Sequence, residues 1–387
     1  MQRDVCLVGF GRVGSVAARL LREWGLPPLV VDASARRVRE AEREGFEARL
    51  MDAASGSGSL FLARTCRVVA TALPSRAAVE ALRSLIAAGA GRIVDVSYIP
   101  DPMEFAGEAA KRGVTLVVDA GVAPGLSNMM VHFSVEHMDS VKDAYIYVGG
   151  LSEEEKGLGL VASWNMEDLV EEYTRPARAI VGGRLVALDP VAGAVSRVEV
   201  PGAGVFEALP TDGLRTLLHT LQGRVASLVE YTLRYPGHLS LLRGLRSLGL
   251  LDERSVVVES CSIEPRALLA RLLEERLPRE GDRLVLYTRV RGRSGRSVKT
   301  VEYILDARQS EAGLDTPVLT YATGLVHAWL TRHVAVDAGD ELPAGVVPPE
   351  RFSSLLPRLL EELGRRGLVV WRRTTYEEEV HTGAGGL

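Results

Sequence analysis

The first third of the chain alternates short apolar runs with stretches that repeat apolar residues at helical spacing. Val5–Val8 and Leu29–Val31 are uninterrupted apolar runs, which are typical of buried strands. Between them, residues 12–24 repeat apolar positions as an amphipathic helix does, and Gly25 closes the pattern. The same alternation continues to about residue 125. It predicts an α/β domain with a doubly wound parallel sheet and helices on both faces.

The other elements predicted for this part follow the same pattern. The strands are Ala48–Asp52, Arg67–Ala72, Arg92–Val96 and Val114–Asp119, the helices are Ala35–Glu44, Arg76–Ala88 and Met103–Arg112, and Ser55–Ser59 is expected to be a loop.

Beyond Asn128 the pattern becomes one of half-buried antiparallel strands with helices between them. The predicted strands are Ala144–Val148, Ala179–Val181, Leu185–Ala187, Val225–Tyr235, Ser255–Ser260, Arg283–Arg291 and Ser297–Ala307, with a turn at Gly149–Gly150. The predicted helices are Asp212–Thr220, Leu239–Ser247 and Pro265–Leu277. This pattern predicts an α+β domain with an open sheet, and such a sheet commonly pairs across a homodimer or higher homo-oligomer.

From Thr316 the chain becomes helical again, with predicted helices at Val318–Thr331 and Pro349–Arg366 separated by residues 345–349. We expect these helices to return to the first domain. The expected organisation is a nucleotide domain over residues 1–127, a substrate and dimerisation domain over 128–312, packing helices over 313–371 and a mobile tail over 372–387.

Composition excludes several classes of protein. An apolar fraction of 47% with 25% charged residues is ordinary for a soluble protein, and no apolar run is long enough for a membrane span or signal segment. We therefore expect a cytoplasmic protein with no membrane partner. A net charge of −4 without a basic block disfavours nucleic acid as a partner. The three cysteines show no paired spacing, so neither a disulfide nor a metal site is expected, and Cys261 is read as a buried thiol. Nearly all basic residues are Arg, which fits a thermophile or a GC-rich genome.

Gly9, Gly11 and Gly14 follow the first strand and open the first helix. The first glycine allows a tight turn, the second lets the backbone approach a pyrophosphate, and the third lets the helix pack close to the strand. Asp32, 18 residues beyond Gly14, ends the second strand and would bind the ribose hydroxyls of a dinucleotide. This context predicts a Rossmann domain that binds NAD.

The other candidate cofactor contacts lie in the turn and after successive strands, where ligands of such sheets bind. They are Phe10, Arg12, Val13, Ala33, Asp52, Ala72, Leu73, Pro74, Ser97, Gly121 and Pro124. A carboxylate at Asp32 would repel a 2′-phosphate and favours NAD, whereas Arg36 and Arg37 keep NADP open as an alternative.

Several motifs together resemble the saccharopine dehydrogenase-like family, and most closely its lysine 6-dehydrogenase branch. They are residues 94–100 (VDVSYIP), 119–128 (DAGVAPGLSN), 168–177 (DLVEEYTRPA), 211–216 (TDGLRT) and 232–238 (TLRYPGH). Where saccharopine reductases of the family tend to carry an acid before Pro-Gly, this chain has Ala123. The resemblance implies an enzyme of amino-acid metabolism that oxidises L-lysine at the ε-carbon with NAD. The products would be 2-aminoadipate 6-semialdehyde, which cyclises to piperideine-6-carboxylate, and ammonia.

Such an oxidation needs a carboxylate clamp, a group for the α-ammonium and a proton acceptor, but no metal. For the clamp, the family motifs point to Arg234 and Arg215, with Arg175 behind them, because arginine binds carboxylates with two parallel hydrogen bonds. Asp212 and Glu172 are candidates for the ammonium, although either is also an ordinary helix acid.

Tyr98, Asp119 and His238 are the candidate proton acceptors. Histidine in general titrates in the useful range, which favours His238, but His238 would equally cap the following helix. Asp119 would equally hold the glycine loop through backbone amides. Trp164 would form a wall for the aliphatic part of the substrate, or belong to the core.

Two alternative functions remain open. One is a reductase that joins an amine to a carbonyl substrate, of the saccharopine or carboxynorspermidine type, which needs a longer pocket with two or more carboxylate clamps. The other is a nucleotide-binding regulator without catalysis, which the motifs of the second domain disfavour.

Overall fold

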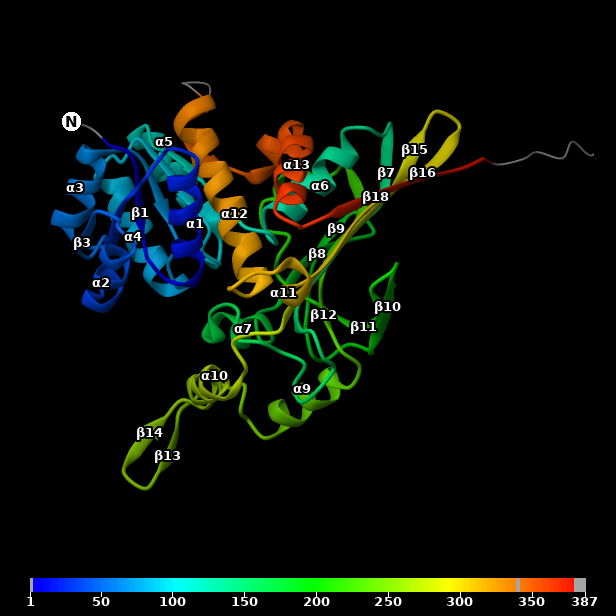
Figure 1. Cartoon of the computed structure of the whole chain (residues 1–387). Coiled ribbons are helices and arrows are strands. Elements are labelled where there is room, and N and C mark those ends of the chain that lie inside the picture. Colours follow the sequence, from blue (N-terminus) through cyan, green and yellow to red (C-terminus); the bar gives the residue numbers. More distant parts are fainter. Residues whose placement is uncertain (1–2, 339–341, 379–387) are drawn as a thin grey trace, which may run out of the picture.

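The computed structural model describes residues 3–338 and 342–378. Two sheets dominate it, one parallel and one mixed, with α12 (Val318–Arg332) packed between the first sheet and the C-terminal helices (Figure 1). Among these residues, no helix is long and apolar enough to cross a membrane.

The first sheet is parallel throughout and has the order β17-β6-β5-β4-β1-β2-β3, which confirms the predicted doubly wound domain. Its strands are β1 (Arg3–Val8), β2 (Leu29–Asp32), β3 (Ala48–Leu50), β4 (Cys66–Thr71), β5 (Arg92–Asp95), β6 (Thr115–Val117) and β17 (Gly345–Val347). Its helices are α1 (Arg12–Glu23), α2 (Ala35–Arg43), α3 (Gly56–Thr65), α4 (Ser75–Ala87) and α5 (Ala106–Arg112), the last preceded by a 3-10 turn at Pro102–Phe105.

The second sheet has the order β10-β11-β12-β7-β15-β16-β18, with the hairpin β8–β9 attached to β12. Its strands are β7 (Ser140–Ser152), β8 (Ala177–Val181), β9 (Arg184–Leu188), β10 (Ser196–Val200), β11 (Gly204–Pro210), β12 (Val225–Arg234), β15 (Asp282–Ser294), β16 (Ser297–Arg308) and β18 (Val370–Glu377). The helices around it are α6 (Leu126–Val135), α7 (Met166–Glu172), α8 (Leu217–Thr220), α9 (His238–Ser247), α10 (Pro265–Arg276) and α11 (Gln309–Ala312).

The C-terminal segment returns to the first domain, as expected from the helical pattern. A Cβ at Gly324 of α12 would lie 2.7 Å from Val16 of α1, so the two helices are in close contact at this glycine. Beyond α12, a π-helical turn (His333–Asp337), a 3-10 helix (Pro349–Leu355) and α13 (Leu356–Arg365) complete the chain's helices in the described residues.

Several predicted elements differ from the structure. Gly149 and Gly150 are not a turn but lie inside β7. They are glycines because a Cβ on Gly149 would lie 2.9 Å from Leu233 and a Cβ on Gly150 would lie 2.6 Å from Leu319. The segment expected to separate the last helices forms β17, and α3 begins inside the predicted Ser55–Ser59 loop.

Three further predictions are corrected. The expected helix from Asp212 is reduced to α8, and residues 255–260 contribute to a separate exposed hairpin of β13 (Val256–Val258) and β14 (Cys261–Ile263), which projects beyond α10 (Figure 1). The expected tail begins as β18, which pairs with β16, and residues 379–387 lie outside the described part. The strands β10 and β11 and the helix α7 were not predicted.

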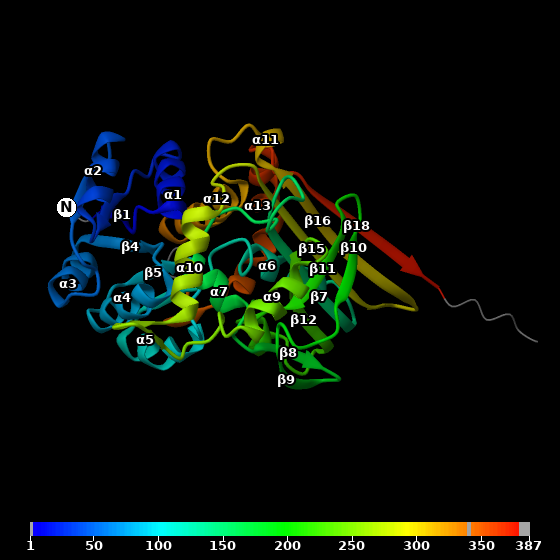
Figure 2. The same ribbon diagram turned by 90° about the horizontal axis from the view of Figure 1, so that it is seen from below.

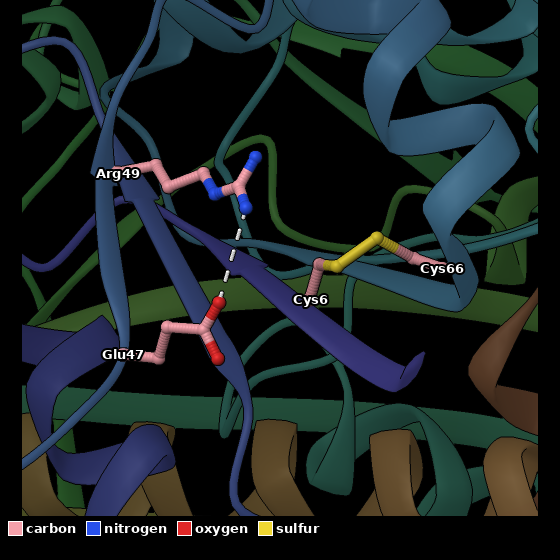
Figure 3. The surroundings of a disulfide bond; sticks show 4 residues. All are labelled: Cys6, Glu47, Arg49 and Cys66. Carbon is pink, nitrogen blue, oxygen red and sulfur yellow. Dashed lines mark ion pairs between the residues drawn. A yellow bond between two sulfur atoms is a disulfide. The ribbon is translucent and has the colours of Figure 1, made fainter. Parts of the chain in front are cut away.

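The cysteine prediction is wrong on two points. Cys6 of β1 and Cys66 of β4 form a disulfide, with a Cα–Cα distance of 5.8 Å, because two strands 60 residues apart in sequence are neighbours in the sheet. Figure 3 shows this bond together with the nearby ion pair of Arg49 and Glu47. Cys261 is exposed on β14 instead of buried.

Candidate active site

A cavity of about 510 Å³ lies where the carboxyl ends of the first sheet meet the second domain. The first domain contributes Gly11, Arg12, Val13, Arg37, Ala72, Leu73, Pro74, Ser97, Tyr98, Gly121 and Pro124. The second contributes Trp164, Asp168, Glu172, Glu230, Thr232 and Arg234, and α12 adds Leu319, Thr320 and Thr323. The cavity thus joins predicted cofactor contacts to predicted substrate contacts in one space.

The glycine turn has the geometry that a dinucleotide requires. Gly9 has a φ of +95°, and a Cβ there would lie 2.4 Å from the Ala72 carbonyl oxygen. A Cβ at Gly14 would lie 1.9 Å from the Gly9 oxygen, whereas one at Gly11 would meet nothing within 4 Å. Gly11 is the N-cap residue of α1 and has no side chain that could cap the helix. The backbone amides of the first turn therefore face the cavity and have no hydrogen-bond acceptor in the side chain of this residue.

Asp32 is held beside this turn by two backbone amides. Its Oδ2 accepts a hydrogen bond from Phe10 N at 2.8 Å, and its Oδ1 accepts one from Ser34 N at 2.7 Å. Arg37, which lines the cavity, pairs with Glu40 at 2.7 Å. These residues fit the adenosine end of a nicotinamide dinucleotide, whose bound nicotinamide would supply a hydride acceptor.

Some predicted cofactor residues do not line this cavity. Phe10 packs edge-on against Phe46, with ring centroids 5.7 Å apart, and Asp52 accepts a hydrogen bond from Ala54 N at 2.9 Å before α3. Gly9, Gly14, Asp32 and Ala33 likewise do not line the cavity, and they act through the shape of the turn and the end of β2.

A buried acid that was not predicted from the sequence supports the cavity wall at Leu73 and Ser97. Asp95, at the end of β5, accepts hydrogen bonds from Thr71 at 2.6 Å and Ser97 at 2.8 Å, and Ser97 Oγ accepts one from Leu73 N at 3.3 Å. Burial raises the pKa of Asp95 to about 7. The network fixes two predicted cofactor contacts, Leu73 and Ser97.

Arg12 ties the glycine turn to the second domain. Its Nη1 donates to the Trp164 carbonyl oxygen at 2.8 Å, and its Nη2 lies 2.5 Å from Glu274 of α10. Figure 2 shows α10 between the nucleotide domain and the second sheet. The two domains are therefore linked by direct contacts at the entrance to the cofactor site.

One face of β12 forms the substrate side of the cavity. Glu230, Thr232 and Arg234 alternate along the strand and therefore project from the same face. Arg234 is 3% exposed; its Nε donates to Tyr173 Oη at 2.8 Å and its Nη2 to Glu172 Oε2 at 3.2 Å. Glu172 also accepts a hydrogen bond from Thr232.

Aromatic rings and a third acid complete this side. Tyr98 and Trp164 meet edge-to-face with centroids 6.4 Å apart, and burial raises the pKa of Tyr98 well above its ordinary value. Asp168, near the start of α7, lines the cavity. Burial raises the pKa of Asp168 to about 6, although a hydrogen bond with Ser75 partly lowers it. Tyr98 with its pKa raised so far is a poor proton acceptor, whereas Asp168 titrates in a useful range.

Four other predicted site residues are engaged away from the cavity. Asp119 and Arg215 form an ion pair at 3.3 Å, both with fully buried side chains. Asp212 makes a bidentate pair with Arg178, at 2.9 and 3.0 Å. Arg175 pairs with Glu171 at 2.5 Å and lies over the Tyr98 ring.

His238 also stands behind the cavity wall. It begins α9, and its Nε2 is 3.1 Å from Tyr173 Oη. Burial and then Arg234 lower its pKa to about 3. A histidine that stays neutral in this position supports the packing of Tyr173 and Arg234, in line with the helix-start alternative.

Glu230 and Asp168 are two buried cavity acids that were not predicted from the sequence. The signal for Glu230 was its period-two spacing with Thr232 and Arg234 on a predicted strand. Asp168 belongs to the 168–177 motif, but helix α7 was not predicted, so the sequence did not show that the Asp168 side chain lines the cavity.

Known protein families and solved structures match most of the chain. A family model for the saccharopine dehydrogenase C-terminal domain matches residues 121–368, and a TrkA-N domain model matches residues 5–89. Among solved structures, the apo histidine-tagged saccharopine dehydrogenase (L-Glu forming) from Saccharomyces cerevisiae has a TM-score of 0.74 at 19% identity, covering 96% of this chain and 99% of that chain. GenD2 from gentamicin A biosynthesis, in complex with NAD, has a TM-score of 0.43 at 14% identity, covering 98% and 97%.

The yeast likeness shows the fold, and the first family model spans well over half of the chain. The resemblance seen in the sequence motifs is thereby confirmed at the level of the family. The protein belongs to the saccharopine dehydrogenase family of oxidoreductases.

Proposed function

We propose that the protein oxidises L-lysine at the ε-carbon with NAD, releasing ammonia and 2-aminoadipate 6-semialdehyde. In this reaction the substrate amine loses a proton, and the ε-carbon transfers a hydride to the cofactor. Water then adds to the resulting imine, and ammonia leaves.

The charge balance of the cavity is the observation that carries this proposal. Its second-domain side presents the acids Asp168, Glu172 and Glu230, with the exposed Glu167 beside them, and one arginine of β12, Arg234. The other lining arginines lie on α1, α2 and α10, which surround the glycine turn. Lysine carries two amines and one carboxylate, so its charges complement this set.

Asp32 supports the preference for NAD. Its carboxylate is fixed by the amides of Phe10 and Ser34 at the end of β2, where a 2′-phosphate would meet a negative charge. Arg37 is the residue that would favour NADP, but its guanidinium is paired with Glu40.

Asp168 is the proton acceptor that we propose for the reacting amine. It lines the cavity next to the nucleotide domain, to which Ser75 belongs, and its pKa of about 6 suits a base near neutral pH. Among the described residues, Tyr98 also lines the cavity but has a strongly raised pKa, and His238 and Asp119 do not line it.

A reductase of the saccharopine type is the alternative within this family. Its substrate needs two or more carboxylate clamps, and in the described part of the cavity Arg234 is the one arginine on the substrate side. The charge balance therefore favours a diamine-bearing amino acid.

The test is the rise in reduced-nicotinamide absorbance with NAD and L-lysine, with ornithine and saccharopine measured in parallel. Reduction by lysine with stoichiometric ammonia release supports the proposal. Turnover of saccharopine without turnover of lysine would contradict it and favour the reductase.

We also propose that the enzyme is a homodimer. The second sheet ends in β18, whose Trp371 is 70% exposed, and an uncovered edge strand with an exposed aromatic residue is a common site of pairing. Sedimentation of the full chain and of a Trp371→Glu variant tests this, because loss of the dimer in the variant would locate the interface on β18.

A further inference from the structure

Glu230 is a buried carboxyl that lacks a positive partner. Its side chain lines the cavity, the residue is 3% exposed, and Oε2 has no hydrogen-bond partner among the described residues. A buried carboxyl without partners costs free energy, so its presence in a cavity wall points to a ligand.

The charged groups around Glu230 explain why it differs from the other acids. The groups that act on it most strongly are Glu172, Asp212, Arg215 and Asp119. Each of the three acids has its own arginine: Glu172 pairs with Arg234 at 3.2 Å, Asp212 with Arg178 at 2.9 Å, and Asp119 with Arg215 at 3.3 Å. In this described cluster, Glu230 is the acid left without a cation.

The backbone of the neighbouring loop positions the Glu230 carboxyl. A Cβ on Gly213 would lie 1.9 Å from Oε1 and 2.1 Å from Oε2, so any larger residue at this position would displace the carboxyl. The glycine of the 211–216 motif therefore leaves the space that the Glu230 carboxyl occupies.

We propose that Glu230, together with Glu172, binds the α-ammonium group of an amino-acid substrate beside the carboxylate clamp Arg234. The α-ammonium and α-carboxylate are attached to the same carbon, so their binding groups must be adjacent. Glu172 and Arg234 meet this condition because they are in direct contact, and Glu230 lies two residues from Thr232, which donates to Glu172. The assignment rests on the proposed function for the identity of the substrate.

The same geometry links binding to proton release. Burial, and then the charge of Glu172, raise the pKa of Glu230 well above its ordinary value, so the free site holds a proton there. An arriving ammonium replaces that proton as the positive partner, and the proton leaves to solvent. Binding of lysine is therefore expected to release about one proton per site.

The test compares substrates with and without an α-ammonium in wild type and in Glu230→Gln. Glutamine keeps the shape of the protonated acid, so the variant is expected to fold, and urea unfolding checks this. We expect kcat/KM for L-lysine to fall about 10- to 100-fold in Glu230→Gln, because a hydrogen bond to a charged group is lost. We expect kcat/KM for 6-aminohexanoate, which lacks the α-ammonium, to change less than about threefold.

A second measurement does not depend on turnover. Calorimetry of L-lysine binding to the complex with reduced cofactor, in buffers of different ionisation enthalpy, counts the protons released. Wild type is expected to release a proton and Glu230→Gln none. Gly213→Ala, which displaces the carboxyl, is expected to resemble Glu230→Gln, and Glu167→Gln, an exposed acid at the cavity, serves as the matched control.

The outcomes separate this assignment from the proposed function. Equal losses for lysine and 6-aminohexanoate, or unchanged proton release in Glu230→Gln, would overturn the ammonium site while lysine oxidation stands. Binding of lysine that depends on Glu230, without any oxidation of lysine, would overturn the proposed function and leave the ammonium site supported.

Discussion

Asp119 and Arg215 form an ion pair between the end of the nucleotide domain's sheet and the second domain, and neither side chain is exposed. Both residues adopt left-handed backbone conformations, with φ of 53° and 54°, and Arg215 also donates to the Pro100 carbonyl oxygen at 3.1 Å. The pair is therefore an internal link between the two domains, and Arg215 is not placed to contact a substrate in the cavity.

Arg215→Met should consequently reduce stability more than substrate affinity. Removing one partner of a buried ion pair typically costs about 3–5 kcal/mol, because the remaining charge stays buried. Urea unfolding measures this loss, and Asp119→Asn combined with Arg215→Met should recover part of it. A stable Arg215→Met enzyme with a large rise in KM for lysine would instead support the clamp role expected from the motif.

The Cys6–Cys66 disulfide should stabilise the nucleotide domain. A bridge that closes a loop of 60 residues contributes about 4 kcal/mol in the chain-entropy model. A Cys6→Ala, Cys66→Ala double variant should therefore unfold at a lower temperature than the oxidised wild type. Cys261→Ser is the matched control, since Cys261 is exposed and unbridged. Equal melting temperatures for all three proteins in the absence of reductant would show that the bridge does not form or does not contribute.

Arg234→Lys should weaken the carboxylate clamp while leaving the cofactor site intact. The new lysine side chain keeps the positive charge but lacks the planar guanidinium, so the variant would lose the hydrogen bonds to both Tyr173 and Glu172. We expect KM for L-lysine to rise about tenfold or more, with the Kd for NAD unchanged. Cofactor fluorescence and steady-state kinetics separate the two, and an equal loss of NAD affinity would contradict the assignment.

Asp32→Asn should reduce the preference for NAD. The variant keeps the size of the side chain but removes the charge next to the ribose position, so the Kd for NAD should rise about tenfold and the discrimination against NADP should shrink. Arg39→Ala, a change of an exposed residue on the same helix, is the control. An Asp32→Asn enzyme that still discriminates fully between the cofactors would show that another residue sets the preference.

His327 should make the protein sensitive to acid. It is fully buried in α12, neither ring nitrogen has a partner among the described residues, and burial lowers its pKa to about 3. Because the folded-state pKa lies below the ordinary value of 6.5, the stability contribution is complete above pH 6.5 and is lost as the pH falls toward 3.

His327→Leu should remove this dependence. The melting temperature of the variant should fall less than that of wild type between pH 7 and pH 4, and His219→Leu, on the exposed side of α8, should behave like wild type. Parallel curves for the His327 variant and wild type would mean that other groups govern acid unfolding.

The sequence was most informative where local pattern and tertiary structure agree. The glycine turn and Asp32 were recognisable because their spacing is set by one strand–helix–strand unit. Gly149 and Gly150 were misread because the reason for these glycines is a contact with Leu233 and Leu319 from other parts of the fold.

The site residues show the same difference between features set by local sequence and features set by contacts from distant segments. Arg234 and Glu172 were found through motifs, and they meet in the cavity. Arg215 and Asp212 belonged to an equally good motif, but the partners Asp119 and Arg178 that neutralise them come from distant segments. Which arginine lines the cavity and which is buried away from it depends on contacts that no local pattern contains.

Strand β17 has a consequence for how the molecule is made. It is the edge of the nucleotide sheet beside β6, yet the chain reaches it after every strand of the second sheet except β18, and Thr115 of β6 donates to the carbonyl oxygen of Pro343 just before it. During synthesis on a ribosome, the first domain must wait with an open edge until nearly the whole polypeptide has emerged. No single cut of the chain therefore separates a cofactor domain from a substrate domain with each keeping all of its strands.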